Sequence, residues 1–144
     1  MQRTIEKEME EYTKQFIPTF KKLSNSSKWL DNNGKIVKDK NKSAKGTKSL
    51  DFEFIYNEIT YYINSKYSEG IFCGGNQENA INEIEAFINV ALKNNDDNIK
   101  FIALLDGGIY FPKHEQKLEK LINNNNYDKV CIMTHDNLIE RFSI

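Results

Sequence analysis

The fold of this chain is set by a stretch that reads Leu50-Asp-Phe-Glu-Phe-Ile-Tyr56, then Asn57-Glu58, then Ile59-Thr-Tyr-Tyr-Ile-Asn-Ser-Lys66. Apolar and polar residues alternate in the two longer runs, which is typical of β-strands that are buried on one face. The two residues between the runs have the length of a tight hairpin loop. The sequence therefore predicts an antiparallel hairpin, in which two residues pair when their numbers add up to a constant sum.

This register predicts that three polar side chains share one corner of the hairpin. Tyr56 is expected to face Ile59, and by the same count Asp51 faces Asn64. Lys66 should project from the same sheet face as Asn64, because side chains alternate along a strand. A carboxylate, an amide and an ammonium then lie together. The plain alternative is a solvated sheet edge, since exposed Asp and Lys are common.

The pattern resembles that of the PD-(D/E)xK nuclease superfamily, which includes many type II restriction endonucleases. Asp51 stands for the acidic residue of the first strand, and Asn64-Ser65-Lys66 stands for the (acidic)-x-Lys triplet of the second. Two positions depart from the family. Leu50 replaces the proline, and Asn64 replaces a charged metal ligand. Some members with a small polar residue there take the carboxylate from the following helix.

This chain has a carboxylate of that kind in a helix predicted to begin near Asn76. Apolar residues recur in it at helical spacing, at Ala80, Ile84, Phe87, Ile88, Ala91 and Leu92. Glu83 is expected to border this buried stripe, whereas Glu78 and Glu85 should point away. The helix start is also similar to that of some restriction enzymes, so Asn79 and Asn82 are expected to contact DNA.

The resemblance implies a Mg2+-dependent endonuclease that hydrolyses phosphodiester bonds in double-stranded DNA. Mg2+ takes about six oxygen ligands. The implied ligands are Asp51, Asn64, the carbonyl of Ser65, and Glu83. Lys66 would orient the attacking water and stabilise developing charge. Asp51, Lys66, Asn64 and Glu83 are thus the expected catalytic residues, and a homodimer is expected because two symmetric sites can cut both strands. Asn64→Asp should be tolerated or should strengthen metal binding.

Lysines crowd the segment ahead of Asp51. The chain has 144 residues, a length that fits one domain of ordinary size, and its formal net charge is -1. The lysines are Lys35, Lys38, Lys40, Lys42, Lys45 and Lys48. They form either a solvated loop or an arm that contacts DNA phosphates, in which case Lys42, Lys45 and Lys48 are the expected contacts.

The remaining composition indicates a reduced, cytoplasmic protein with no membrane contact. It has two cysteines, Cys73 and Cys131, no signal peptide, and no apolar run long enough to span a bilayer. The two histidines, His114 and His135, are interpreted as helix-end residues rather than ligands or bases.

The predicted organisation is a single nuclease-like domain over residues 1–144, with an N-terminal helix within 1–23, a basic loop over 24–48 and a core over 49–144. The first helix should run from about Thr4 towards Pro18, and a short strand is possible at residues 35–38. An apolar run at 99–105 predicts a buried parallel strand, and Asp106-Gly107-Gly108 predicts a turn after it. A helix over 113–122, a strand over 128–133 and a last helix from about Asp136 complete the chain. This order predicts an α/β fold with a mixed sheet, and the resemblance implies that it is the three-layer restriction-endonuclease-like fold, with a central mixed sheet flanked by helices.

Two other interpretations stay open. One is a catalytically inactive or truncated nuclease-fold module for DNA binding or assembly, in which Asn64 records the loss of the metal site. The other is an unrelated α/β interaction domain whose polar corner is only a sheet surface. Metal binding separates the nuclease from both, and salt-dependent DNA binding separates the two from each other.

Overall fold

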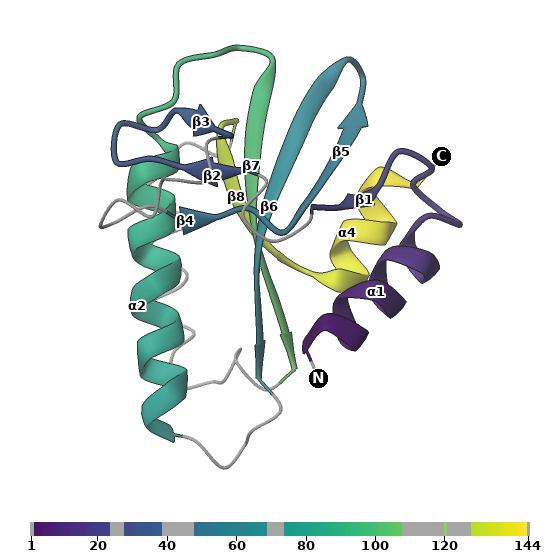
Figure 1. Ribbon diagram of the computed structural model, residues 1–144, viewed down its shortest axis with the longest axis horizontal. Helices are drawn as coiled ribbons and strands as arrows, with labels where there is room; N and C mark the ends of the chain where they lie inside the picture. Colours follow the sequence, from purple (N-terminus) through teal and green to yellow (C-terminus); the bar gives the residue numbers. More distant parts are fainter. Residues whose placement is uncertain are drawn as a thin grey trace.

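The computed structural model describes residues 2–23, 28–38, 48–68, 74–107, 120 and 128–143. For residues 2–6, 66–68, 74–81 and 106–107 it describes the backbone. The described residues form an α/β fold with a mixed main sheet of five strands, in the order β1-β5-β6-β7-β8 (Figure 1).

The main sheet is antiparallel on one side and parallel on the other. β1 (Lys21–Lys22), β5 (Phe52–Tyr56) and β6 (Ile59–Ser68) are antiparallel neighbours. β7 (Ile99–Gly107) and β8 (Val130–Thr134) run parallel to β6. Helix α2 (Gly74–Ala91) connects β6 to β7, as a parallel pair requires a crossover.

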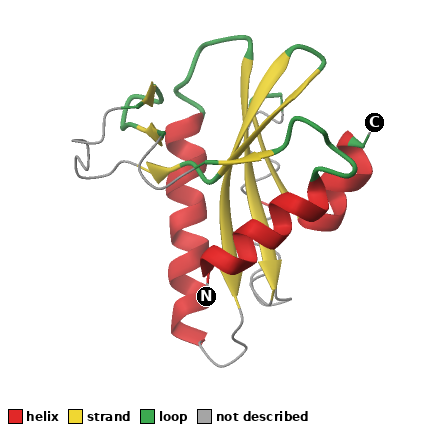
Figure 2. Ribbon diagram, turned by 45° about the vertical axis from the view of Figure 1, so that its right-hand side comes forward, coloured by secondary structure: helices red, strands yellow, loops and turns green. Residues whose placement is uncertain are grey.

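Helices cover both faces of this sheet, as predicted. α2 packs on one face, and α1 (Gln2–Thr13) and α4 (His135–Phe142) pack on the other (Figures 1 and 2). The core under α2 includes Ile84, Phe87, Ile88, Tyr62, Phe101 and Val130. The core under α1 and α4 includes Met9, Phe20, Phe54, Ile63, Leu104, Leu138 and Phe142.

The hairpin has the predicted register. Phe52 pairs with Ile63, Phe54 with Tyr61, and Tyr56 with Ile59. The two loop residues, Asn57 and Glu58, have φ values of 52° and 68°, which are those of the type I′ turn that suits a two-residue hairpin. The bounds differ from the prediction, since β5 begins at Phe52 rather than Leu50 and β6 continues to Ser68.

The first helix is shorter than predicted. It ends at Thr13, before Pro18 is reached. Near its end the aromatic Tyr12 is 50% exposed, while the polar Thr13 is buried. Thr13 has a long-range partner. The hydroxyl of Thr13 lies 2.8 Å from Nε2 of His135, so a polar side chain is satisfied inside the contact between α1 and α4.

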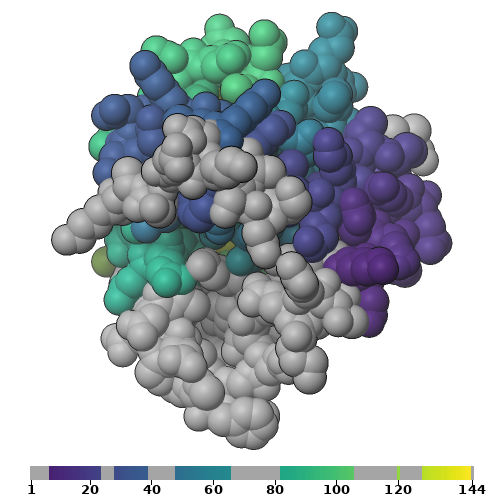
Figure 3. Space-filling model, viewed as in Figure 1, coloured from purple at the N-terminus to yellow at the C-terminus, as the bar shows by residue number. Residues whose placement is uncertain are grey.

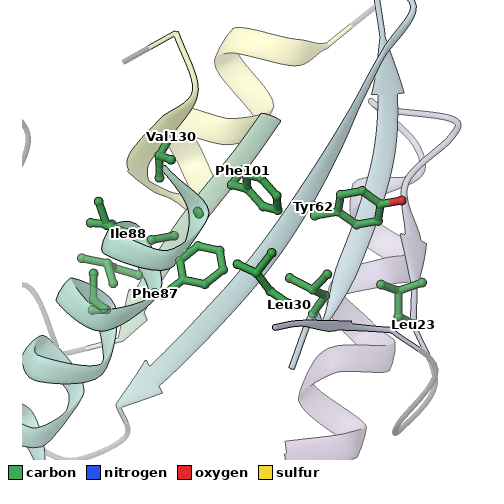
Figure 4. Packing of buried hydrophobic residues seen from close by; sticks show 12 residues of the cluster. Leu23, Leu30, Tyr62, Phe87, Ile88, Phe101 and Val130 are labelled. Carbon is green, nitrogen blue, oxygen red and sulfur yellow. The ribbon is translucent and has the colours of Figure 1, made fainter. Parts of the chain in front are cut away.

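The segment predicted as a basic loop contains a second sheet. β2 (Trp29–Leu30), β3 (Ile36–Val37) and β4 (Lys48–Ser49) form three strands in the order β3-β2-β4, which we call the small sheet. β3 confirms the short strand expected at 35–38. Leu30 is fully buried, and Figure 4 shows its side chain near Phe87 and Tyr62. The small sheet therefore completes the core under α2.

The other elements mostly follow the prediction. α2 begins at Gly74 rather than Asn76, and α4 begins at His135 because Thr134 caps it by accepting from the N–H of Asn137. The expected turn at Asp106-Gly107 is wrong, because both residues continue β7. The helix predicted over 113–122 lies outside the described residues except for Lys120. No helix in the described part of the chain has the length and apolar character needed to cross a membrane.

Candidate functional site

An unpaired stretch of strand edge lies beside the candidate site. The pairing of β5 with β6 ends at Phe52 and Ile63, whereas the pairing of β6 with β7 continues to Ser68 and Gly107. Within the described chain, residues 64–68 of β6 thus have no strand on the β5 side. A sheet edge presents free N–H and C=O groups that need partners.

Asp51 supplies the first of these partners. Its Oδ2 accepts hydrogen bonds from the backbone N–H of Ser65, at 2.8 Å, and from the Ser65 hydroxyl, at 3.0 Å. A strand N–H points along the plane of the sheet. The carboxylate of Asp51 therefore lies beside the edge of β6, next to the residue between Asn64 and Lys66.

The predicted pairing of Asp51 with Asn64 is wrong in detail. The N–H of Asp51 donates to the carbonyl of Ile63, at 2.7 Å, and Ile63 also faces Phe52. Two residues of one strand then meet one residue of the other, which is the arrangement of a β-bulge. The bulge lies where the chain passes from the small sheet to the main sheet. One residue earlier, the N–H of Leu50 bonds to the carbonyl of Lys28, beside the small sheet.

Asn64 faces the α2 side of the sheet and is 5% exposed. Its Nδ2 donates to the backbone carbonyl of Ser49 in β4, at 2.8 Å. This fixes the orientation of the amide, because the flipped amide would set two oxygens against each other. The amide oxygen, Oδ1, has no hydrogen-bond partner among the described residues. Oδ1 is also the only side-chain atom of Asn64 that a metal ion could bind.

Ser65 contributes its backbone at the same edge. The N–H and C=O of one strand residue point to the same neighbour, so the Ser65 carbonyl faces the side on which Asp51 lies. Asp51, Asn64 and Ser65 thus offer a carboxylate oxygen, an amide oxygen and a carbonyl oxygen, which are the ligand types that Mg2+ prefers. Asn64 lies on the face covered by α2, whereas the Ser65 hydroxyl that bonds to Asp51 lies on the opposite face, because side chains alternate along β6. These donors fit the ion, although the described residues contain no group of three or more His, Cys, Asp or Glu side chains that could hold a metal.

The position of Lys66 is described for its backbone. Lys66 pairs with Leu105 of β7, two residues beyond Asn64. Its side chain lies outside the described residues, so its expected distance of about one metal coordination sphere from Asp51 stays a prediction.

Glu83 is exposed, and Glu85 is half-buried. This reverses the predicted order, in which Glu83 bordered the buried stripe and Glu85 pointed away. The two residues lie about 100° on either side of the buried Ile84, so the apolar pattern alone cannot separate them. The helix does bring Glu83 to the level of the site. Phe87 packs against Phe101, with ring centroids 6.1 Å apart, and Glu83 is one turn closer to the start of α2.

The residues expected to contact DNA are only partly placed. Lys48 lies in β4 and is half-buried, and Asn82 is exposed on α2. Lys42, Lys45 and the side chain of Asn79 lie outside the described residues.

The cysteine and histidine expectations are also only partly placed. His135 is the first residue of α4, which confirms it as a helix-end residue. Cys131 is a free thiol, and burial raises its pKa, partly offset by Arg141. His114 and Cys73 fall outside the described residues.

One ion pair near the site was missed from the sequence. Nζ of Lys28 lies 2.6 Å from Oε1 of Glu53, and the two side chains are 19% and 20% exposed. Burial lowers the pKa of Lys28, but the hydrogen bond to Glu53 and the charges of Tyr62 and Glu53 outweigh it, so the pKa is raised above 10.5. Glu53 pairs with Tyr62, and strand alternation could have placed it on the face of Asn64. Its charge is already neutralised by Lys28.

Comparisons of the chain with protein-family models, with curated proteins and with solved structures found no match.

Proposed function

We propose that the protein is a Mg2+-dependent DNA endonuclease that hydrolyses phosphodiester bonds in double-stranded DNA, similar to a type II restriction enzyme. One observation carries the proposal. Asp51 bonds to Ser65 at an edge of β6 that has no strand partner within the described chain, and Asn64 and Ser65 immediately precede Lys66 in the same strand. These are the residues that the resemblance to PD-(D/E)xK nucleases singled out.

The order of the elements supports the proposal. The nuclease superfamily has an αβββαβ core. In this chain α1 is followed in the main sheet by three antiparallel strands, β1, β5 and β6, then by α2 and the parallel strand β7. The small sheet is an addition between β1 and β5. Asp51 immediately precedes the second strand of this series, and the triplet at 64–66 lies in the third.

Each side chain has a role that follows from its surroundings. Asp51, Asn64 and the Ser65 carbonyl would hold Mg2+, with Glu83 as the second carboxylate. A bound Mg2+ would polarise the phosphate and lower the pKa of a water molecule. The two hydrogen bonds from Ser65 hold the Asp51 carboxylate in place before any ligand arrives, so little reorganisation is needed on binding. Lys66 would add a fixed positive charge beside the phosphate.

A second candidate is favoured by a specific observation. Asp51 and Asn64 both hold the backbone together, through Ser65 and Ser49, and Asn64 brings no charge to a metal. The same fold would then serve as an inactive module that binds DNA. We expect such a module to bind duplex DNA without cleaving it.

The test is cleavage of supercoiled plasmid DNA by the native protein, with Mg2+ and with a chelator instead. We expect nicked and linear products with Mg2+ alone. The variant to compare is Asp51→Asn, because its amide oxygen can still accept from Ser65 while the charge needed for the metal is lost. Asp51→Ala would leave the buried N–H of Ser65 without a partner. A loss of cleavage in that variant could then come from lower stability as well as from the loss of a metal ligand.

Cleavage by Asp51→Asn at the native rate would place the chemistry elsewhere in the chain. Binding of DNA by the native protein without any cleavage would favour the inactive module instead.

A further inference from the structure

The small sheet is held to the core at both ends by asparagine amides. At one end, Nδ2 of Asn64 donates to the carbonyl of Ser49 in β4, at 2.8 Å. At the other end, Nδ2 of Asn94, after α2, donates to the carbonyl of Gly34 at 2.7 Å. Gly34 has φ +81°, and a Cβ there would lie 2.6 Å from the backbone nitrogen of Asn94. The turn between β2 and β3 therefore sits directly on the backbone that follows α2.

The surface of the small sheet is basic. Lys35 and Lys38 are exposed, and Lys48 is half-buried in β4. Lys93, also exposed, reaches over from the end of α2 and donates to the carbonyl of Asn32. The sheet lies at the molecular surface beside the segment that follows α2 (Figure 3).

Lysines outnumber acidic residues on the small sheet. In the described ranges 28–38 and 48–50 the only acidic residue is Asp31. Oδ1 of Asp31 accepts from the N–H groups of Asn33 and Lys35, so its carboxylate is used inside the turn. A rigid surface with several lysines and one occupied carboxylate suits the phosphate backbone of a nucleic acid.

We infer that Asn64 is a positioning residue that fixes this phosphate-binding surface against the metal-binding edge of β6, and that an amide is required there because it must donate. Its Nδ2 ties β4 down, while its Oδ1 remains as an acceptor for a ligand. This rests on the proposed function for its catalytic part. It also reverses the expectation that Asn64→Asp would improve the site.

The physical reason is the missing proton. In Asn64→Asp, the atom that replaces Nδ2 would be a carboxylate oxygen facing the Ser49 carbonyl in a position that is 5% exposed. Two acceptors at that distance repel, so β4 should leave β6.

Trp29 reports on this tether directly. It is the single tryptophan of the chain, and it pairs with Ser49 between β2 and β4. The first experiment records its fluorescence emission and its quenching by acrylamide in the full-length protein without metal. At about pH 8 we expect Asn64→Asp to show red-shifted emission and stronger quenching.

Two controls keep this test decisive. Asn95→Asp adds the same charge at an exposed position after α2 and should leave the emission unchanged. If Asn64→Asp fails to fold by circular dichroism, Asn64→Ala takes its place, and it should likewise expose Trp29, because it also removes the amide donor. Native emission and quenching in a folded Asn64→Asp at about pH 8 would overturn the inference, whatever the protein cleaves.

The second experiment measures binding to a short DNA duplex in chelator as a function of salt. The double variant Lys35→Gln/Lys38→Gln should lower the log-log slope by up to about 0.9 for each phosphate that is no longer neutralised by a lysine. The same two changes should have a smaller effect in the Asn64→Ala background, because the surface is no longer held in place. Equal effects in both backgrounds, or no DNA binding by the native protein, would overturn the inference.

The outcome separates this inference from the proposed function. A native protein that binds DNA and shows the Trp29 response but never cleaves would refute the endonuclease and leave the tether standing. An active endonuclease without the Trp29 response would do the opposite.

Discussion

Asn94 and Asn64 hold opposite ends of the small sheet with the same kind of bond, yet their surroundings differ. Oδ1 of Asn94 accepts from Nζ of Lys129, at 2.7 Å, and from the N–H of Asp96, at 3.0 Å. Oδ1 of Asn64 has no hydrogen-bond partner in the described part of the chain. We call the first region the closed corner and the second the open corner. A polar cluster whose donors and acceptors are paired with one another contributes to stability, whereas a cluster with an unpaired acceptor at a strand edge can bind a ligand.

Lys129 shows how complete the closed corner is. Its ammonium group has three donors, and they reach Oδ1 of Asn94, the carbonyl of Asp96 and the carbonyl of Ile99, at 2.7, 2.8 and 2.7 Å. The closed corner lies at the start of β7, far along the sheet from the open corner. Substitutions in the two corners should therefore have opposite consequences for activity and for stability.

The largest difference is expected in cleavage. Lys66→Ala, beside the open corner, should reduce the cleavage rate by about a hundredfold or more, because it removes charge stabilisation in the transition state. Lys129→Met should change the rate by less than about threefold where it is folded, because this side chain is remote from the chemistry. Rates on plasmid DNA with excess enzyme would show this. A similar loss of cleavage rate in both variants would show that the two corners do not differ in their contribution to catalysis.

For stability, substitution in the closed corner should have the larger effect. Lys129→Met removes the donor to two backbone carbonyls and one of the two donors to the Asn94 amide oxygen, so we expect it to lower the free energy of unfolding by about 2–3 kcal/mol. Asn64→Ala breaks one neutral hydrogen bond, and we expect a cost of about 1 kcal/mol. Urea titration of the metal-free protein measures both. A larger cost for Asn64→Ala would mean that the open corner is the main support of the fold.

A third prediction concerns Glu83 as a metal ligand beside the open corner. If it supplies the second carboxylate, Glu83→Gln should lower cleavage by about tenfold or more, the scale on which losing a group that supports a metal site acts. It should also raise the Mg2+ concentration needed. Glu85→Gln, on the other flank of Ile84, is the matched control and should retain native cleavage. The proposed role is refuted if an active native enzyme is indifferent to Glu83→Gln.

The smallest effect concerns alkaline pH, where two lysines should act in opposite directions. The pKa of Lys28 is raised above 10.5. Its stabilising pair with Glu53 is therefore complete below 10.5 and is lost as the pH rises through the raised value. Burial lowers the pKa of Lys129 below 10.5, partly offset by Asp96 and Asp97. Its charged form is penalised by folding, so stability should rise as the pH climbs from the lowered value to 10.5.

Unfolding free energies measured by urea titration between about pH 9 and 11.5 separate these contributions. Glu53→Gln should flatten the loss above 10.5, and Lys129→Met should remove the gain below it. Parallel curves for the native protein and both variants would show that neither lysine contributes.

The hairpin, β7 and the buried stripe of α2 were predictable because their signals are local. Alternation and a two-residue loop are enough to set the register of Phe52 to Ile63. The small sheet carried no such signal, since its strands have two residues each and no periodicity. The bulge at Asp51 depends on that sheet, because it forms where the chain moves from one sheet to the other. The sequence therefore identified Asp51 and Asn64 but missed how each is held.

Other misses have the same origin. The closed corner joins Asn94 to Lys129 across 35 positions of the chain, and the bond between Thr13 and His135 spans 122 positions. No pattern within either segment signals its partner. The Lys28–Glu53 pair also joins two sheets that sequence periodicity does not reveal.

The hairpin loop has a consequence for how the chain can tolerate insertions. Side chains repeat every two residues along a strand, so one extra residue between Tyr56 and Ile59 would change which residues face each other along the whole hairpin. Asp51 would then meet the backbone of a different residue, and the bonds to Ser65 would be broken without any change at the site itself. Surface loops usually accept length changes, but the length of this loop sets which residues of the two neighbouring strands face each other.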